Sequence, residues 1–292
     1  MAVRFVQLDV FSEAPGGGNP LGVVFGAAHW SDAQRQAFAR WVDLVETTFV
    51  VPPRTPEAHY RVRIHTPQRE IAYAGHPSVG TAHAAHALGY VDAGVEQIIQ
   101  DCDAGLLAIR RSGPLEAPRF AVAAPALHCL SPDPALLQAA QALLAPLSLG
   151  ALGLTLVEGG RRWWVAEIAE EAALRGWKPQ HEGIAALAQR SGSLGLCVFA
   201  RSASPDYQLA VRAFPAGVGI VEDPASGAAN GLIAALIALR EPTSTLARGY
   251  RVSQGREIGR DAQLDVEQAD GRIWVGGRSH LLIDGTLHWP GG

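Results

Sequence analysis

Short runs in which hydrophobic and polar residues alternate dominate the chain, and few segments have helical spacing. Arg4 to Phe11 and Leu21 to Phe25 are apolar runs of strand length. Tyr60 to His65 alternates arginine with apolar residues, as a half-buried strand does. Thr47 to Val51 is rich in β-branched residues and stops at Pro52-Pro53. The pattern predicts a protein made mainly of strands.

Two segments have clear helical character. Ser31 to Val42 places its apolar residues on one face, and Ser31 followed by Gln34 forms a capping box. The apolar residues of that face are Ala37, Phe38, Trp41 and Val42. A second helix is predicted from Asp133 to Leu144. The helix from Asp133 would open the second half of the chain.

Glycine-rich turns are predicted at both ends of the chain. Gly16 to Pro20 interrupts the first two apolar runs. Near the C-terminus, strands at Arg272 to Val275 and Leu281 to Ile283 are expected around turns at Gly276-Gly277 and Asp284-Gly285.

An internal repeat relates the two halves of the chain. The segment Gly75 to His83 aligns with Glu222 to Asn230, so that proline, glycine and alanine coincide in both copies. The coinciding pairs are Pro77 with Pro224, Gly80 with Gly227, and Ala82 with Ala229. Each copy leads from a strand through a loop into an alanine-rich helix. Two similar halves that face each other across a cleft are therefore expected.

Both copies predict the same chemistry at the start of a helix. His76 and Asp223 are expected at or near the N-cap, with Pro77 and Pro224 in the first helical position. The following backbone N–H groups lack intrahelical partners, and with the helix dipole they favour an anion. His76 and Asp223 could instead simply cap their helices, and aspartate is among the favoured N-cap residues, so a catalytic role needs further support.

Composition excludes several classes of protein. The chain has 292 residues, 48% of them hydrophobic and 18% charged, which suffices for two globular domains. The net charge of −4 and the lack of a basic run argue against nucleic acid as a partner. No uninterrupted apolar stretch is long enough to cross a membrane, so no membrane partner is expected.

The cysteines and histidines predict neither a disulfide framework nor a metal site. Cys102, Cys129 and Cys197 are odd in number and widely spaced. With an N-terminus that lacks a signal peptide's apolar stretch, they indicate a cytoplasmic setting. His83 and His86 are three residues apart on a predicted helix, but no third ligand lies nearby in sequence. No metal is expected.

A domain boundary is expected where prolines cluster, between about Gly113 and Pro134. We place the first domain at residues 1–118 and the second at residues 119–292, and the last strands could pack on the first domain.

Several sequence blocks resemble those of the phenazine biosynthesis-like (PhzF-like) isomerases, relatives of diaminopimelate epimerase. The resemblance extends nearly end to end, and the ordered series is far more specific than any single block. The blocks are Asp9-Val10-Phe11, Gly18-Asn19-Pro20-Leu21, Leu44 to Val50, Ile64-His65-Thr66-Pro67, Ala74 to Pro77 with Gly80-Thr81-Ala82, Glu222-Asp223-Pro224 with Gly227, and Gln254-Gly255 with Gly259-Arg260.

The resemblance implies an α+β fold of two pseudo-symmetric lobes. Each lobe would be a curved mixed β-sheet around a central α-helix, with the active site in the cleft between them. It implies a homodimer and no cofactor. It also implies that Glu46 takes a proton from one carbon and returns it to another, assisted by His76 and Asp223. Val45, Gly75, Gly227 and Ala228 would then contact the substrate.

Two positions depart from the family pattern. The residue before the glutamate is often serine and is Val45 here, and the residue after Gly227 is often serine and is Ala228 here. Both hydroxyls could bind a polar group of a substrate, so these changes leave the substrate's identity open. The proton chemistry needs neither hydroxyl. In the epimerase relatives a pair of cysteines does the work, and no cysteine occupies a motif position here.

The sequence therefore predicts a cofactor-independent isomerase that moves a proton on a small carboxylate metabolite by acid/base catalysis. An epimerase or racemase of an amino or hydroxy acid could use the same groups. A catalytically silent metabolite-binding protein of the same fold is a further alternative. Retention of Glu46 argues against the silent protein, because binding alone does not need that carboxylate.

Overall fold

The chain folds into two compact units, which the computed structural model describes over residues 2–289. Unit 1 comprises residues 1–123 and 276–292, and unit 2 comprises residues 124–275. The chain therefore enters unit 2 after Ala123 and returns to unit 1 at Gly276. The boundary that we placed at residue 118 lies five residues before the first crossing, and the last strand does belong to the first unit.

Unit 1 is built on a mixed sheet. Its strands are β1 (Val3–Val10), β2 (Asn19–Phe25), β3 (Glu46–Val51), β4 (Tyr60–His65), β5 (Glu70–Ile71), β6 (Gln97–Cys102), β7 (Gly105–Ser112), β8 (Arg119–Ala123) and β17 (Ser279–Leu287). Hydrogen bonding joins them in the order β17-β1-β2-β3-β4-β6-β7-β8, and β5 also pairs with β4. The β2–β3 and β4–β6 pairs are parallel and the others are antiparallel.

Unit 2 repeats this pattern of pairing. Its strands are β9 (His128–Leu130), β10 (Leu149–Gly159), β11 (Arg161–Ile168), β12 (Gly195–Arg201), β13 (Leu209–Phe214), β14 (Gly249–Gln254) and β15 (Ala262–Ala269), and β16 (Arg272–Gly277) runs across the second crossing. The order β9-β10-β11-β12-β13-β14-β15 has parallel pairs at β11–β12 and β13–β14. Parallel pairs thus occupy the same places as in unit 1, as the internal repeat predicts.

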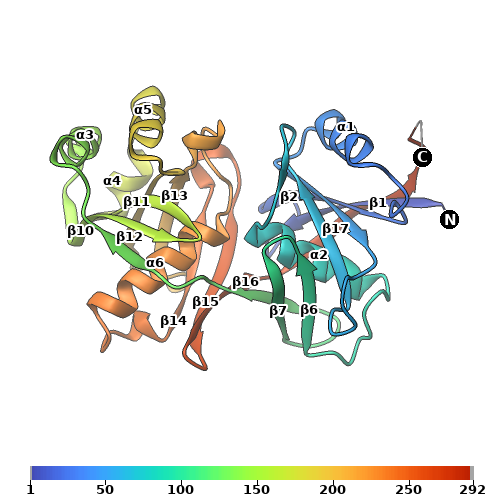
Figure 1. Ribbon diagram of the computed structural model, residues 1–292. Coiled ribbons are helices and arrows are strands. Elements are labelled where there is room, and N and C mark those ends of the chain that lie inside the picture. Colours follow the sequence, from blue (N-terminus) through green and yellow to red (C-terminus); the bar gives the residue numbers. More distant parts are fainter. Residues whose placement is uncertain (1, 290–292) are drawn as a thin grey trace. The chain divides into compact units, whose positions relative to one another are not determined.

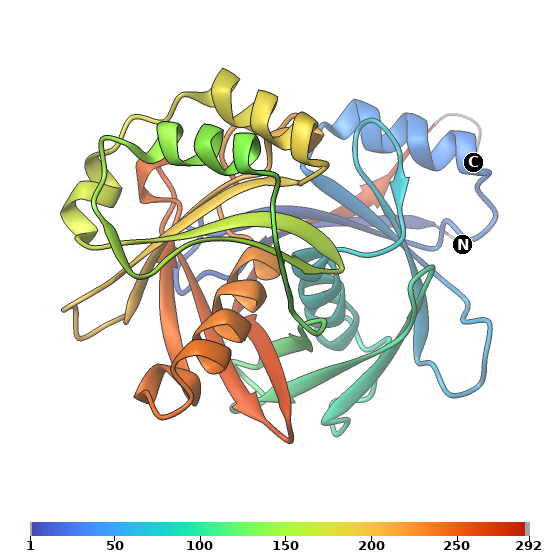
Figure 2. The ribbon, with the colours of Figure 1, turned by 60° about the vertical axis from the view of Figure 1, so that its left-hand side comes forward.

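Each unit encloses one helix within its curved strands (Figures 1 and 2). In unit 1 this helix is α2 (Gly75–Ala87), which contacts β1, β2, β3, β4, β7, β8 and β17. In unit 2 it is α6 (Gly227–Arg240), which contacts β10, β11 and β15. The small residues of both helices let strands approach closely on several sides. The α+β class with two similar halves is confirmed.

The outer faces of the sheets carry the remaining helices. They are α1 (Asp32–Val42) on unit 1, and α3 (Pro134–Leu144), α4 (Glu171–Gly176) and α5 (His181–Ser191) on unit 2. Short 3-10 turns lie at Ala216–Val218, Thr245–Ala247 and Arg256–Ile258. None of the helices in the described part of the chain is both long and apolar enough to cross a membrane.

The outer helices follow the sequence predictions closely at their starts. Ser31 caps α1 with the complete capping box that its spacing with Gln34 predicts, and Asp133 caps α3. Part of the α1 prediction is wrong, because Ala37 is exposed and Trp41 is 67% exposed. The buried face of α1 consists of Arg35, Phe38 and Ala39 instead.

The predicted C-terminal turns are also wrong. Gly276-Gly277 completes β16, and a side chain at Gly276 would collide with the backbone of Phe120 and Ala121. Asp284-Gly285 lies inside β17, where Asp284 pairs with Val6 of β1. Gly276 thus allows a close strand contact and Gly285 lies within a paired strand, and local sequence does not distinguish either position from a turn.

Gly80 sets how closely α2 packs on its sheet. A Cβ atom there would lie 2.5 Å from Leu21 Cδ2 and 2.6 Å from Val10 Cγ2, and both of these side chains are fully buried. Val10 and Leu21 belong to β1 and β2, so glycine brings the helix directly onto both strands.

We expect Gly80→Ala to lower the free energy of unfolding by about 1–3 kcal/mol, because overpacking outweighs the gain of about 1 kcal/mol in helix propensity. Gly176→Ala is the helical control, since a Cβ at Gly176 meets nothing within 4 Å. That variant should keep or raise stability. Urea unfolding followed by tryptophan fluorescence measures both, and an undiminished stability of Gly80→Ala would contradict the prediction.

Candidate active site

Glu46 opens strand β3 at a half-buried position of unit 1. Its side chain is 12% exposed, and its backbone pairs with Leu21 at the beginning of the parallel β2–β3 ladder. The next three residues of β3 are fully or nearly fully buried. A carboxyl group is thus held at the rim of a core where side chains have little freedom.

His76 faces this carboxyl group from α2. Its Nε2 atom lies 3.5 Å from Oε2 of Glu46, and the residue is 6% exposed. Burial lowers the pKa of His76 to about 3, and a hydrogen bond to the backbone of Pro20 offsets this only in part. The imidazole is therefore neutral at physiological pH, and the contact with Glu46 is not an ion pair.

A hydrogen bond between two threonines fixes α2 against β3. Oγ1 of Thr48 and Oγ1 of Thr81 are 2.8 Å apart in the buried interior. Thr48 lies two residues after Glu46 on the same strand, so both side chains point to the same face of the sheet. The Thr48–Thr81 contact thereby sets the relative positions of Glu46 and His76. Both threonines lie within motif blocks of the sequence, but no role for either was predicted.

The first turn of α2 has a second anchor in Gln100. Its side-chain amide donates to Oγ of Ser78, which itself donates to the carbonyl of Ala74. Ala74 is the N-cap residue and offers no side-chain hydrogen bond. The start of the helix is therefore held by groups of the core rather than by its own cap.

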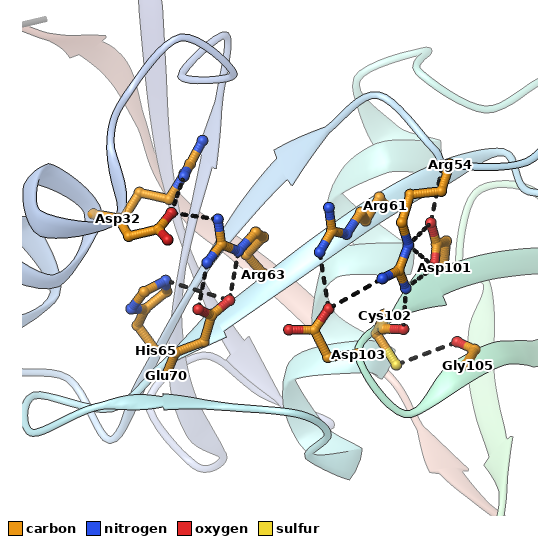
Figure 3. Close-up of polar contacts among 11 residues, drawn as sticks. Asp32, Arg54, Arg61, Arg63, His65, Glu70, Asp101, Cys102, Asp103 and Gly105 are labelled. Carbon is orange, nitrogen blue, oxygen red and sulfur yellow. Dashed lines mark hydrogen bonds and ion pairs between the residues drawn. The ribbon is translucent and has the colours of Figure 1, made fainter.

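An ion-pair network holds the chain that leads into α2 (Figure 3). Arg63 of β4 binds Glu70 of β5 through two of its nitrogens and Asp32 of α1 through a third. The pairing with Glu70 and Asp32 raises the pKa of Arg63 above its ordinary value, despite the opposing effect of burial. The same view shows Arg54 and Arg61 bound to Asp101 and Asp103, which support β6.

Asp223 lies in unit 2, in a loop that several groups hold in place. Its N–H donates to the carbonyl of Ala213 at 2.9 Å, and its own carbonyl accepts from Nε2 of Gln254 at 2.8 Å. Its carboxylate accepts from the N–H of Ala225. The preceding Glu222 forms a buried bidentate ion pair with Arg212.

This Arg212–Glu222 pair repeats the Arg63–Glu70 pair of unit 1. Both arginines stand in equivalent strands, and both glutamates stand in the segment that leads to the enclosed helix. Arg212 also donates to the carbonyls of Leu174 and Trp177. The duplication thus extends from topology to the polar contacts beside each helix start.

The helix starts differ from the sequence prediction. The prediction placed His76 and Asp223 at or near the N-cap, but Ala74 caps α2, and Ser226 caps α6 by accepting from the N–H of Ala229. His76 is the second residue of α2. Asp223 lies four residues before α6 begins, because its carboxylate forms a turn with Ala225 instead of a cap.

The residues predicted to contact substrate lie at these helix starts and beside Glu46. Gly75 is the first residue of α2 and is buried, and Val45 precedes Glu46 at a partly buried position. Gly227 and Ala228 are the first two residues of α6, where Ala228 is exposed. The structure thus brings Glu46 and His76 together within unit 1 and places Asp223 in unit 2.

The three cysteines are free thiols with no sign of activation. Burial raises the pKa of both Cys102 and Cys197, and the charge of Asp223 raises that of Cys197 further. Cys129 is exposed on β9. Within residues 2–289 no group of three or more histidine, cysteine or acidic residues is arranged to hold a metal ion.

Comparison with known proteins assigns this arrangement to a family. The chain is 31% identical to trans-2,3-dihydro-3-hydroxyanthranilate isomerase of Pseudomonas chlororaphis over 92% of its length and 91% of the relative's. A phenazine biosynthesis protein of the PhzF family from Bacillus anthracis has the same fold, with a TM-score of 0.84, 21% identity, and coverage of 99% and 100% of the two chains. A protein from Pseudomonas aeruginosa described as a predicted epimerase has a TM-score of 0.77 and 25% identity, with coverage of 97% and 98%.

The fold and these relatives define the protein as an isomerase. It belongs to the phenazine biosynthesis-like (PhzC-PhzF) family, whose model matches residues 8–285.

The buried histidine predicts a pH dependence of stability. His76 has a pKa of about 3 in the folded protein and about 6.5 when unfolded, so the unfolded chain binds the proton more readily between these values. The part of the stability that depends on His76 is fully present above about pH 6.5, and it is lost progressively as the pH falls to about 3. His65, buried beside Phe49, has its pKa lowered by burial in the same direction.

At pH 5 we expect His76 alone to cost about 2 kcal/mol of stability relative to pH 7.5. Urea unfolding at both pH values measures the difference in the wild type and in His76→Asn. Acidification should lower the free energy of unfolding of His76→Asn by about 2 kcal/mol less than that of the wild type. An equal loss in both proteins would show that His76 takes up a proton in the folded state.

Proposed function

We propose that the protein moves a proton on a small carboxylate-containing metabolite by acid/base catalysis, with Glu46 as the group that takes and returns the proton. The observation that carries the proposal is the approach of a half-buried carboxyl group to a buried neutral imidazole, with Oε2 of Glu46 3.5 Å from Nε2 of His76. The residues of this pair supply the chemistry, so the proposal requires no cofactor.

The surroundings of Glu46 suit a group that must change its protonation state. A carboxylate at the edge of a packed core is less well solvated than one in water, which strengthens its tendency to take a proton. A general base works best when both of its forms are accessible near the working pH. Arg61 and Arg63 of β4, and Arg54 in the loop before it, bind the acidic residues Asp103, Glu70 and Asp101.

The substrate class follows from the helix starts and from the relatives. The first N–H groups of α2 and α6 favour a bound carboxylate, and Ala74 provides no competing side chain at the start of α2. The name of the Pseudomonas chlororaphis relative designates an isomerase of a hydroxylated dihydroanthranilate, a small amino carboxylate. Val45 and Ala228 lack the hydroxyls common in the family, which favours a substrate with a different pattern of polar groups.

Asp223 is the proposed second acid/base or charge-handling group. Support comes from its position in the internal repeat, which is equivalent to the beginning of α2. The Arg212–Glu222 ion pair and Gln254 hold the backbone on both sides of it. A loop fixed so firmly around one partly buried carboxylate suits a group that must be kept in a defined orientation.

An epimerase is the second candidate function, favoured by the relative described as a predicted epimerase. The same Glu46–His76 pair would return the proton to the opposite face of the original carbon. Racemisation by two thiols is disfavoured, because Cys102 and Cys197 are buried with raised pKa values. Chiral chromatography of the product separates epimerisation from isomerisation.

Glu46→Gln should bind substrate nearly as well as the wild type and lose at least about 10²-fold in turnover, because an amide cannot take up a proton at neutral pH. Trans-2,3-dihydro-3-hydroxyanthranilate and a set of small amino and hydroxy acids are the test compounds. Turnover and deuterium uptake from heavy water measure the proton transfer, and a ligand-induced shift in melting temperature measures binding.

Glu116→Gln is the matched control, because Glu116 is exposed on a loop of the same unit and should leave turnover unchanged. Asp223→Asn tests the second group in the same assay. Near-wild-type turnover of Glu46→Gln would refute the proposed role of Glu46 and direct attention to Asp223. Binding by the wild type without any deuterium uptake would favour the silent metabolite-binding protein.

A further inference from the structure

Gln254 is a fully buried residue at the end of β14, in unit 2. Its Nε2 atom donates to the carbonyl of Asp223 at 2.8 Å. Its Oε1 atom accepts from the N–H of Ser226 at 3.3 Å and from Nδ2 of Asn230 at 2.9 Å. One side chain therefore binds the loop that carries Asp223, the N-cap residue of α6, and a side chain of the helix itself.

Asn230 fixes the direction in which the Gln254 amide points. Asn230 is also fully buried, and its Nδ2 donates to the carbonyl of Ser226 at 2.8 Å as well as to Oε1 of Gln254. Carbonyl oxygens can only accept, so the carbonyls of Ser226 and Asp223 at the two ends of this series of bonds both need an NH2 group. Rotation of either amide would place oxygen against oxygen. The hydrogen bonds therefore have a single consistent arrangement.

The end of β14 also lies directly against the loop that carries Asp223. Gly255 has φ +90°, and a Cβ atom there would lie 2.7 Å from the carbonyl oxygen of Pro224. Backbone contact at Pro224 thus adds to the hydrogen bond that Gln254 makes with the preceding residue. The Asp223 carboxylate accepts from the N–H of Ala225 within the same loop. The backbone that carries this carboxylate is therefore held from β14.

A buried glutamine has the equivalent place in unit 1. Gln100 of β6 is fully buried, and β6 pairs in parallel with β4 as β14 pairs with β13. Its Nε2 donates to Oγ of Ser78 in the first turn of α2, and its Oε1 accepts from the hydroxyl of Tyr60. The duplicated feature is a buried amide that binds the start of the enclosed helix. In unit 2 this amide also binds the backbone of Asp223.

We propose that Gln254, with its amide oriented by Asn230, is a positioning residue that holds the Asp223 carboxylate at a fixed distance from the first N–H groups of α6. Those N–H groups have no intrahelical partner and favour the carboxylate of a substrate. A substrate held in this way presents the same carbon to Asp223 only if the two groups keep their distance. The donor end of the amide sets the position of Asp223, and the acceptor end sets the start of the helix. The catalytic consequence rests on the proposed function of Asp223.

Hydrogen exchange tests the structural part without any substrate. The N–H of Ser226 donates to Gln254, so it should exchange at least about 10-fold faster in Gln254→Met, which keeps the length of the side chain but has no amide. NMR of the full-length protein measures the rate. Gln268→Met is the control, because Gln268 is exposed on β15 and its replacement should leave the rate unchanged.

An unchanged exchange rate at Ser226 in a folded Gln254→Met would overturn the proposal. If that variant does not fold, Asn230→Ala decides by the same measurement, because it removes the bonds that orient the Gln254 amide. The same acceleration is expected there, and an unchanged rate would again refute the inference.

Kinetics separate the two ends of the amide. At pH 8.5 the ionised carboxylate of Gln254→Glu still accepts from Ser226 and Asn230 but repels the carbonyl of Asp223. We expect kcat to fall about 10- to 100-fold, with KM within about threefold of the wild-type value. Gln254→Met loses both ends of the amide and should also raise KM about 10-fold. The substrate is the compound, among those named above, that takes up deuterium fastest, and a wild-type kcat in Gln254→Glu would overturn the role of the donor end.

A double-mutant cycle tests whether Gln254 acts through Asp223. In the Asp223→Asn background, Gln254→Glu should lower kcat by less than about threefold, because the group that it positions no longer carries a proton. The full loss in that background would refute the positioning role. A wild-type kcat in Asp223→Asn would overturn the catalytic consequence, and a lack of deuterium uptake by every compound would refute the proposed function. In both cases exchange at Ser226 still decides whether Gln254 fixes the start of α6.

Discussion

The close contact between α2 and the first strands of unit 1 determines the geometry of the candidate site. Gly80 allows the helix to touch β1 and β2, and the Thr48–Thr81 hydrogen bond locks it against β3. Because His76 and Glu46 lie at the ends of these elements, their 3.5 Å separation follows from backbone packing rather than from flexible side chains. Such a site is preorganised, since the core that stabilises the fold also holds the reacting groups.

The sequence predicted the features that depend on local pattern or on repetition. The alternation of arginine with apolar residues predicted β4 with its observed bounds. The spacing of Ser31 and Gln34 predicted the capping box of α1. The repeated proline and glycine positions predicted two equivalent enclosed helices, and both units have them. The family blocks led to Glu46 and His76, which the structure brings together.

The features that the sequence did not predict arise from tertiary contacts. Gly276 and Asp284-Gly285 have turn-like sequences but lie in strands, because neighbouring backbone comes too close for a side chain at Gly276 and because β1 pairs with β17. Trp41 has the spacing of a buried residue and is exposed. The Thr48–Thr81 hydrogen bond likewise joins two blocks that resemblance alone had identified, and no local pattern predicts it.

The return of the chain to unit 1 at Gly276 has a consequence for synthesis on the ribosome. Unit 2 is one continuous segment, so it can complete its contacts as soon as residue 275 has emerged. Unit 1 begins first but needs β17, which follows unit 2 in the sequence and pairs with β1 along eight residues. Vectorial folding usually favours the N-terminal domain. Here the unit that starts second can finish first, and the nascent β1–β2 hairpin must keep its open edge from pairing with other chains until β17 has emerged.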